Sequence, residues 1–458
     1  MDPETVITHE EDLLEYFRRG ARPRERWGIG VEYERFGVFR DTGRAIPYEG
    51  EASVETILKT LADTRGWSPH DESGRILSLT RDTSSVTLEP GGQMELSGAV
   101  HSTLAEARRE LFDFVSEVEE VSRPLGIAWL GIGSHPISPL AEISWIPKRR
   151  YAIMRDYLPT RGSLAHAMMK GTACIQVNFD YADEADAVEK LRIAMGLSPL
   201  VTALYANSPL TEGRRNGFQS YRSWVWRDTD PDRCGLLPFV FREETGFSDY
   251  LQYALGIPMF FVVRDGRWVA GGRTTFRTFI RDGFEGTHAT YADFTMHMTT
   301  LFPEVRLKQY IEMRGCDSGT PETCIALAAL WKGLLYDDTS RAASWALVRD
   351  MSFQERDELL ARICRDGMGA TLAGSRRGAG KRGVSVRDLL IELVQLARDG
   401  LERQKAASET AYLDPLDRRI EEEGGGLAVR LADAWDGELQ HDPAALVSAI
   451  VGTEADRS

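Results

Sequence analysis

Segments in which apolar and oxygen-bearing side chains alternate every second residue are the feature that most constrains this fold. In GIGVEYE, residues 28–34, the acids Glu32 and Glu34 alternate with Val31 and Tyr33. Because alternate side chains of a strand project from opposite faces, both carboxylates lie on one face of the predicted strand. Like charges so close together need a positive charge or solvent to offset their repulsion. The segment therefore predicts a strand with one apolar face and one acidic face.

Other segments repeat this pattern, and they are TLEPGGQMELS (87–97), TACIQVNFDY (172–181) and YIEMRGCD (310–317). A Pro-Gly-Gly turn separates Glu89 from Glu95, so a hairpin here brings the two acids together. An antiparallel sheet with one polar face either faces solvent or lines a polar cavity. Glycines beside the acids, and the scarcity of cations among them, favour the cavity.

The predicted strands and helices mix without a regular βαβ order, which favours an α+β domain with a largely antiparallel sheet. We expect this domain to span residues 1–338 and a helical extension, residues 339–458, to pack on it. Within the extension, residues 366–383 are rich in Gly and Arg and predict a mobile loop, either closing over a site or serving as a connector. The helices expected in the extension are 339–350, 353–364, 385–405 and 443–451.

Composition excludes several classes of protein. The formal net charge of −15 and pI near 5.2 argue against a nucleic-acid binder, because such proteins need a positive field to displace counterions from phosphates. No segment reaches the roughly 20 apolar residues of a membrane span. The acidic, amphipathic N-terminus lacks a secretory pattern and the five cysteines are scattered. These features predict a cytoplasmic protein without a membrane partner.

Carboxylates without nearby histidine or cysteine are hard oxygen ligands, which suit Mg²⁺ or Mn²⁺ better than zinc. Magnesium held by glutamates in a cleft indicates phosphate chemistry, with ATP as the expected nucleotide. The chain lacks a Walker A loop, since GSRRGAGK has the wrong glycine spacing and Arg382 where Ser or Thr is required. A nucleotide therefore binds through another architecture.

Long segments of the chain closely resemble glutamate-cysteine ligases of the plant and proteobacterial type. The resemblance runs in order from about residue 25 to about residue 440, and the segments that carry it include GIGVEYERFG, TLEPGGQMELSG, PKRRYAIMRDYLP, FPEVRLKQYIEMRGCD and WKGLLYDD. It implies a glutamine synthetase-like fold, in which a curved antiparallel sheet forms an active-site funnel within the α+β domain.

The resemblance also implies a reaction. Enzymes of this family join the γ-carboxylate of L-glutamate to the amine of L-cysteine, using ATP and Mg²⁺ and passing through γ-glutamyl phosphate, as the first step of glutathione biosynthesis. Two or three Mg²⁺ ions, or Mn²⁺, are expected. The positions that match the metal site of the family are Glu32, Glu34, Glu89, Glu95, Glu312 and Gln176.

Further roles follow from the same resemblance. Arg314 matches a residue that contacts ATP phosphates and, with Glu34, is the expected catalytic residue. Arginines that hold the glutamate substrate match two positions here, and a planar guanidinium suits its carboxylate. Aromatic residues flank one of these arginines and are expected to line the substrate pocket. The predicted substrate-binding residues are Arg150, Arg222, Tyr221 and Trp226.

Two alternatives remain open from the sequence. A γ-glutamyl ligase with a different amine acceptor would keep the same acids and arginines. A non-catalytic scaffold would retain the nucleotide site without turnover. A monomer and a homodimer are equally compatible with the chain.

Overall fold

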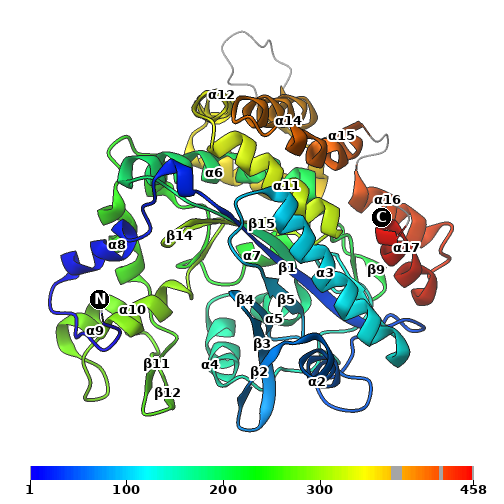
Figure 1. Ribbon diagram of the computed structural model, residues 1–458, viewed down its shortest axis with the longest axis horizontal. Helices are drawn as coiled ribbons and strands as arrows, with labels where there is room; N and C mark the ends of the chain where they lie inside the picture. The colour runs from blue at the N-terminus through cyan, green and yellow to red at the C-terminus, as the bar shows by residue number, and fades with distance from the viewer. Residues whose placement is uncertain (1, 373–383, 422–425, 456–458) are drawn as a thin grey trace.

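The computed structural model describes residues 2–372, 384–421 and 426–455. Its centre is a nine-stranded sheet in the order β14-β15-β7-β1-β5-β4-β3-β2, with β6 paired to β1 (Figure 1). All pairings within this sheet are antiparallel, which confirms the expected α+β class with a largely antiparallel sheet. The strands are β1 (Ile29–Phe39), β2 (Ser68–Glu72), β3 (Arg75–Arg81), β4 (Ser84–Leu88), β5 (Met94–Ser97), β6 (Ile127–Leu130), β7 (Cys174–Phe179), β14 (Val305–Leu307) and β15 (Ile311–Asp317).

Three long helices, α3, α6 and α11, pack against one face of the sheet. The apolar residues of the alternating segments point toward them, and Val31 and Tyr33 of β1 are fully buried. The helices that precede the C-terminal region are α1 (Leu14–Arg18), α2 (Val54–Arg65), α3 (Leu104–Ser122), α4 (Arg149–Tyr157), α5 (Ala165–Gly171), α6 (Glu184–Tyr205), α7 (Tyr221–Arg227), α8 (Phe247–Gly256), α9 (Phe276–Asp282), α10 (Tyr291–Met298) and α11 (Pro321–Leu335).

A hairpin formed by β11 (Phe261–Arg264) and β12 (Arg267–Ala270) projects beside the sheet. Its turn is the Asp265-Gly266 pair, and both residues have positive φ, 49° and 72°, as a tight two-residue hairpin turn requires. The remaining short strands pair as β8 (Leu210–Thr211) with β9 (Arg214–Arg215), β10 (Cys234–Gly235) with β13 (Phe302–Pro303), and β16 (Thr371–Leu372) with β17 (Val384–Ser385).

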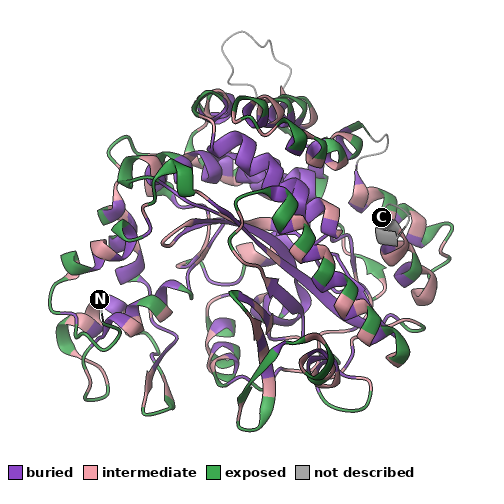
Figure 2. Ribbon diagram, viewed as in Figure 1, coloured by how far each residue is buried: buried purple, intermediate pink, exposed green. Residues whose placement is uncertain are grey.

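Helices dominate after residue 338, as the sequence predicts. They are α12 (Asp338–Val348), α13 (Phe353–Asp366), α14 (Val386–Arg403), α15 (Asp414–Glu421), α16 (Leu427–Asp436) and α17 (Pro443–Ala455), of which α15 and α16 were not expected. Helices α12 and α14 pack on α6 and α11, and Figure 2 shows that the inner helices of this layer are buried. Trp435 and Leu446, from α16 and α17, form a second apolar cluster with Phe36 and Val38 of β1.

The division into a domain at 1–338 and an extension at 339–458 stays a prediction. Most of the predicted mobile loop 366–383 lies outside the described residues, because these end at 372 and resume at 384. The two ends flanking that gap are held together by the β16–β17 pairing. Within the described part of the chain, no helix combines the length and the apolar character needed to cross a membrane.

A buried ion pair attaches the C-terminal helices to the sheet-covering layer. Lys332 of α11 donates to Glu409, whose other oxygen accepts the backbone N–H of Leu104 at 2.9 Å. Lys332→Met is expected to lower the free energy of unfolding by about 3 kcal/mol, because it leaves the Glu409 charge buried without its partner. Urea denaturation measures this change. Adding Glu409→Gln should restore part of the loss, and a single-variant effect near zero would contradict the prediction.

Candidate active site

A cavity of about 530 Å³ lies on the polar face of the sheet, opposite α6 and α11. Alternate residues of β1, β7 and β15, together with the turn between β4 and β5, form much of its wall. The side chains predicted as metal ligands all line this cavity, and they are Glu32, Glu34, Glu89, Glu95, Glu312 and Gln176. The polar faces of the predicted strands therefore line a cavity rather than face open solvent.

Strand register explains how residues distant in the sequence meet here. Glu34 of β1 lies opposite Glu95 of β5, while Glu32 lies opposite Gln176 of β7. Directly opposed side chains of antiparallel strands begin about 5 Å apart at their Cβ atoms. The central strand β1 thus presents one glutamate to each neighbouring strand.

Burial and mutual repulsion leave negative charge uncompensated in this cluster. Burial, with the neighbouring Glu89 adding to it, raises the pKa of Glu34 to about 7. Burial likewise raises the pKa of Glu95 well above its usual value, and the charges of Glu32, Glu89 and Glu34 add to the effect. Only neutral donors hold Glu34 directly, namely the N–H of Cys174 at 2.8 Å, its Sγ–H at 3.0 Å and Nε2 of Gln176 at 3.5 Å. A cation placed here would be strongly stabilised.

Glu312 differs from these acids because it is already paired. Its carboxylate accepts hydrogen bonds from Nε and Nη2 of Arg306, the latter at 2.8 Å. The side-chain nitrogens of Lys308 and Arg314 each lie 3.5 Å from it. Burial alone would raise the pKa of Glu312, but these three cations hold that pKa well below its usual range. The scarcity of cations predicted for this face is therefore wrong. Arg306 of β14 and Lys308, which follows β14, add two cations beside Glu312.

The acids do not close into a metal cage by themselves. Among the described residues, no three histidine, cysteine or carboxylate side chains are close enough together to hold an ion. Neutral donors hold two of the carboxylates, since Thr87 donates to Glu95 at 2.6 Å and Asn178 donates to Glu32 at 2.8 Å. Any ion bound here would need ligands from a substrate or from water in addition.

The three predicted arginines also line the cavity. Arg314 donates from Nη1 to Oε1 of Gln176 at 2.6 Å, which fixes its guanidinium above β7. Arg222 of α7 is buried and donates from Nη2 to the backbone oxygen of Arg314 at 2.9 Å. Arg150 of α4 donates from Nη2 to the Tyr151 hydroxyl at 3.1 Å. The cavity therefore carries acids in its floor and guanidinium groups around them.

The two aromatic residues expected in the substrate pocket both belong to α7, but only one of them lines the cavity. Trp226 lines the cavity, one helical turn from Arg222, and its ring lies 5.6 Å from that of Phe302. Tyr221 does not line it, and its ring instead contacts Phe218 at 5.7 Å. Residues four apart share a helix face, whereas adjacent residues diverge by about 100°. Tyr221 therefore turns away from the cavity that Arg222 and Trp226 line, and its role in binding the substrate stays a prediction.

An apolar wall completes the cavity, and sequence reasoning missed it. Met154 of α4, Met296 of α10, and Phe261 and Trp268 of the β11–β12 hairpin line this side. The two hairpin rings meet edge to face at 4.7 Å. Asp-Gly signalled the hairpin, but nothing in the sequence indicated that it reaches the acidic strands. Cys174 was also missed, although its place in the alternation of β7 puts it on the same face as Gln176 and Asn178.

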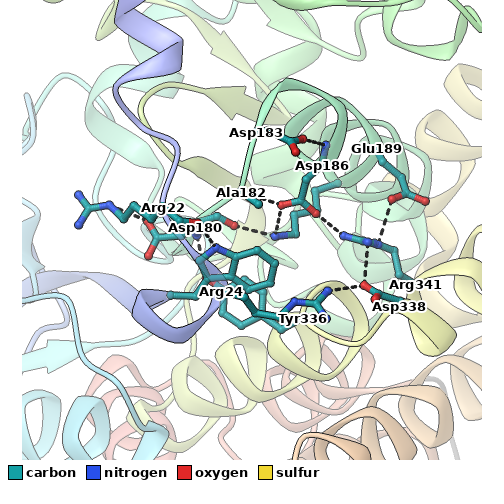
Figure 3. Close-up of polar contacts among 12 residues, drawn as sticks. Arg22, Arg24, Asp180, Ala182, Asp183, Asp186, Glu189, Tyr336, Asp338 and Arg341 are labelled. Carbon is teal, nitrogen blue, oxygen red and sulfur yellow. Dashed lines mark hydrogen bonds and ion pairs between the residues drawn. The ribbon is translucent and has the colours of Figure 1, made fainter.

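The rim of the cavity is fixed by a polar network that extends into the helical layer (Figure 3). Asp180, which lines the cavity, accepts the N–H of Gly28 at 2.7 Å and faces Arg22. Lys190 of α6 donates to the backbone oxygen of Asp180 at 2.9 Å and to Asp186 at 2.8 Å. Arg341 of α12 then pairs with Asp186 and, at 2.8 Å, with Asp338. This network ties the end of β7 to helices α6 and α12.

Comparison with known proteins places this site in a family. The model of the glutamate-cysteine ligase family 2 matches residues 28–446. Glutamate–cysteine ligase B, chloroplastic, of Oryza sativa subsp. japonica is 39% identical over 434 residues, which are 94% of this chain and 85% of the relative. Glutamate–cysteine ligase, chloroplastic, of Arabidopsis thaliana is 38% identical over 442 residues, which are 95% of this chain and 82% of the relative.

These names correct one expectation. The rice, Brassica juncea and Arabidopsis thaliana relatives are named chloroplastic, so this comparison contradicts the expected cytoplasmic location.

A solved structure shares the fold. The glutamate–cysteine ligase of Francisella tularensis, solved in complex with AMP, aligns with a TM-score of 0.56 at 11% sequence identity, covering 94% of this chain and 92% of that one. Identity this low supports the architecture alone, whereas the family model and the plant relatives cover nearly the whole chain. The chain therefore belongs to the glutamate-cysteine ligase family and is a ligase.

Proposed function

We propose that this protein joins the γ-carboxylate of L-glutamate to the amine of L-cysteine at the expense of ATP, the first step of glutathione biosynthesis. The observation that carries the proposal is that buried glutamates of β1 and β5 share one cavity with Arg150, Arg222 and Arg314. Such a site holds anionic substrates beside a phosphate-binding cluster. The names and extent of the matching relatives support the same reaction.

The donor set fits Mg²⁺, with Mn²⁺ as a substitute. Carboxylate and amide oxygens are the ligands of hard cations, and burial, with the charge of Glu89 added, raises the pKa of Glu34, so a cation here would be favoured. Magnesium usually keeps several waters or phosphate oxygens as ligands, so it does not require a closed cage of acids. The ligand set Glu32, Glu34, Glu89, Glu95, Gln176 and Glu312, for two or three ions, stays a prediction.

Bound magnesium would neutralise the phosphate oxygens of ATP, and the remaining work falls to the protein. Arg150 and Arg222 hold the α-carboxylate of glutamate, so that its γ-carboxylate oxygen attacks the γ-phosphorus and ADP leaves. Arg314, oriented by Gln176, stabilises the charge spread over the transferred group. The cysteine amine then attacks the acyl carbon of γ-glutamyl phosphate, phosphate leaves, and the amine gives up a proton.

The apolar wall supports a small apolar acceptor side chain. Met154, Met296, Phe261 and Trp268 offer thioether and aromatic contacts, which suit a thiol better than a charged group. This argument favours cysteine but does not by itself exclude another amine of similar size.

Product formation tests the proposal against both alternatives. Purified protein is supplied with Mg·ATP, glutamate and a panel of amines, and ADP and the γ-glutamyl product are measured. We expect ADP release to require both glutamate and an amine, with cysteine preferred. Strong preference for another amine would establish the alternative acceptor, whereas ATP binding without ADP release would establish the non-catalytic scaffold.

The affinity for Mg²⁺ is expected to fall as the pH decreases through about 7. Since the pKa of Glu34 is raised to about 7, the metal-free folded protein takes up a proton there as the pH falls, and that proton competes with the ion. Below that pH the affinity should decrease by up to about tenfold per pH unit. Titration of Mg²⁺ with a non-hydrolysable ATP analogue measures it.

The Glu34→Gln variant is the control for this experiment. It retains the nucleotide, whose own phosphates titrate, but lacks the carboxyl that takes up the proton. Its weaker Mg²⁺ binding should therefore vary less with pH than that of the wild type. Equal pH dependence in both proteins would assign the effect to the nucleotide and contradict the role of Glu34.

A further inference from the structure

Glu304 is a buried carboxylate beside the cavity, in the short segment between β13 and β14. Its side chain is more than nine-tenths buried, and Oε2 has no hydrogen-bond partner within the described part of the chain. The backbone is fixed on both sides, because its N–H donates to Gly235 and its oxygen accepts the N–H of Arg314, each at 3.0 Å. A Cβ at position 315 would lie 2.3 Å from Oε2, so the glycine there is what makes room for the carboxylate.

A side cavity of about 10 Å³ adjoins this carboxylate, with room for a single water or ammonium-sized group. Glu304 lines it, together with Arg222, Trp226, Phe302 and Arg314. All four of these neighbours also line the main cavity, so the two spaces share a wall. Glu304 therefore lies next to Arg222, in the side cavity that adjoins the proposed substrate site.

Other carboxylates near Arg222 already have donors of their own. Asp317 accepts the hydroxyl groups of Ser208 and Ser220 at 2.6 and 2.7 Å, and Glu34 accepts both donors of Cys174. Arg222, in turn, makes no ion pair with a carboxylate in the described part of the chain, and its Nη2 donates to a backbone oxygen. Arg222 and Glu304 thus line the same side cavity, in which Oε2 of Glu304 has no hydrogen-bond partner among the described residues.

This pair matches the head of an α-amino acid, in which a carboxylate and an ammonium group are attached to one carbon. We propose that Arg222 binds the α-carboxylate of the substrate and that Glu304 binds its α-ammonium group. Glu304 is then the residue that selects an α-amino acid over a simple dicarboxylic acid. The inference rests on the proposed function, because it assumes that glutamate occupies this cavity.

A substrate lacking only the amine isolates this contact. Glutamate and glutarate are titrated calorimetrically into the full chain with Mg²⁺ and a non-hydrolysable ATP analogue, in the wild type and in Glu304→Gln. Loss of the charged contact should weaken glutamate binding about tenfold or more and leave glutarate binding within about twofold. Equal weakening of both compounds would show that Glu304 acts only by supporting Arg222, and unchanged binding of both would also overturn the proposal.

Two further variants keep the test sharp. Gly315→Ala retains the charge but displaces the carboxylate, so it should also weaken glutamate more than glutarate. Thr202→Val is the matched control, because its hydroxyl donates to the backbone oxygen of Gly315 at 3.2 Å without lining either cavity. Its ratio of glutamate to glutarate affinity should equal that of the wild type. A wild-type protein that binds neither compound would refute the proposed function, and this inference with it.

Discussion

Replacement of Glu34 by alanine is expected to reduce ATP-dependent ligation about a thousandfold. The carboxylate lies in the floor of the cavity, opposite Glu95, and only neutral donors, from Cys174 and Gln176, hold it. Its charge is therefore available to the bound cation. Without the carboxylate, the cation binds more weakly and is misplaced relative to the transferred phosphoryl group. The measurement is kcat/KM for glutamate, followed as ADP release at saturating cysteine.

Folding should survive the same change. Burial and the repulsion of Glu89 make the Glu34 carboxylate unfavourable in the metal-free protein, so its removal offsets the cost of the small cavity left behind. Glu55→Ala is the control, since this acid of α2 pairs with Lys59 at 3.0 Å, away from the cavity. Full activity in Glu34→Ala would exclude the metal assignment, whereas loss of activity together with unfolding would show a structural role.

The alternation of side chains predicted which residues of the central strands share the polar face. Period-two patterns in β1, β5 and β7 assigned Glu32, Glu34, Glu95 and Gln176 to that face, and all four line one cavity, while their roles stay predictions. This succeeds because a strand leaves each side chain only two directions, and an apolar neighbour fixes which of them faces the core. The sheet class follows from the same local information.

Features that depend on tertiary contacts were not predictable in this way. Glu312 shares the alternation, yet Arg306 pairs with it because β14 folds back on β15. Tyr221 is next to Arg222 in the sequence yet lies outside the cavity, because the packing of α7 decides which of its faces reaches the cavity. The apolar wall comes from α4, α10 and the β11–β12 hairpin, whose docking is set by packing between distant segments. Glu304 lies between two short strands and shows no periodicity that marks it.

The second large effect is expected at Arg314. Its replacement by alanine should lower kcat about a thousandfold, because the guanidinium faces the region where charge develops during phosphoryl transfer. The loss should appear in kcat more than in KM for ATP, since the interaction strengthens in the transition state. Steady-state kinetics with varied ATP, at saturating glutamate and cysteine, separates these two constants.

Arg314→Lys distinguishes a guanidinium from a positive charge. The arginine donates to Gln176 at 2.6 Å while its Nη1 also lies 3.5 Å from Glu312, and these contacts aim its planar group into the cavity. Lysine keeps the charge but is a single point donor on a flexible stem, so most of the loss in kcat should remain. Arg267→Ala, at an exposed position of the hairpin, serves as the control for changes in net charge. Near wild-type turnover in Arg314→Lys would mean that a positive charge alone suffices, and the orientation imposed by Gln176 would then have no part in the reaction.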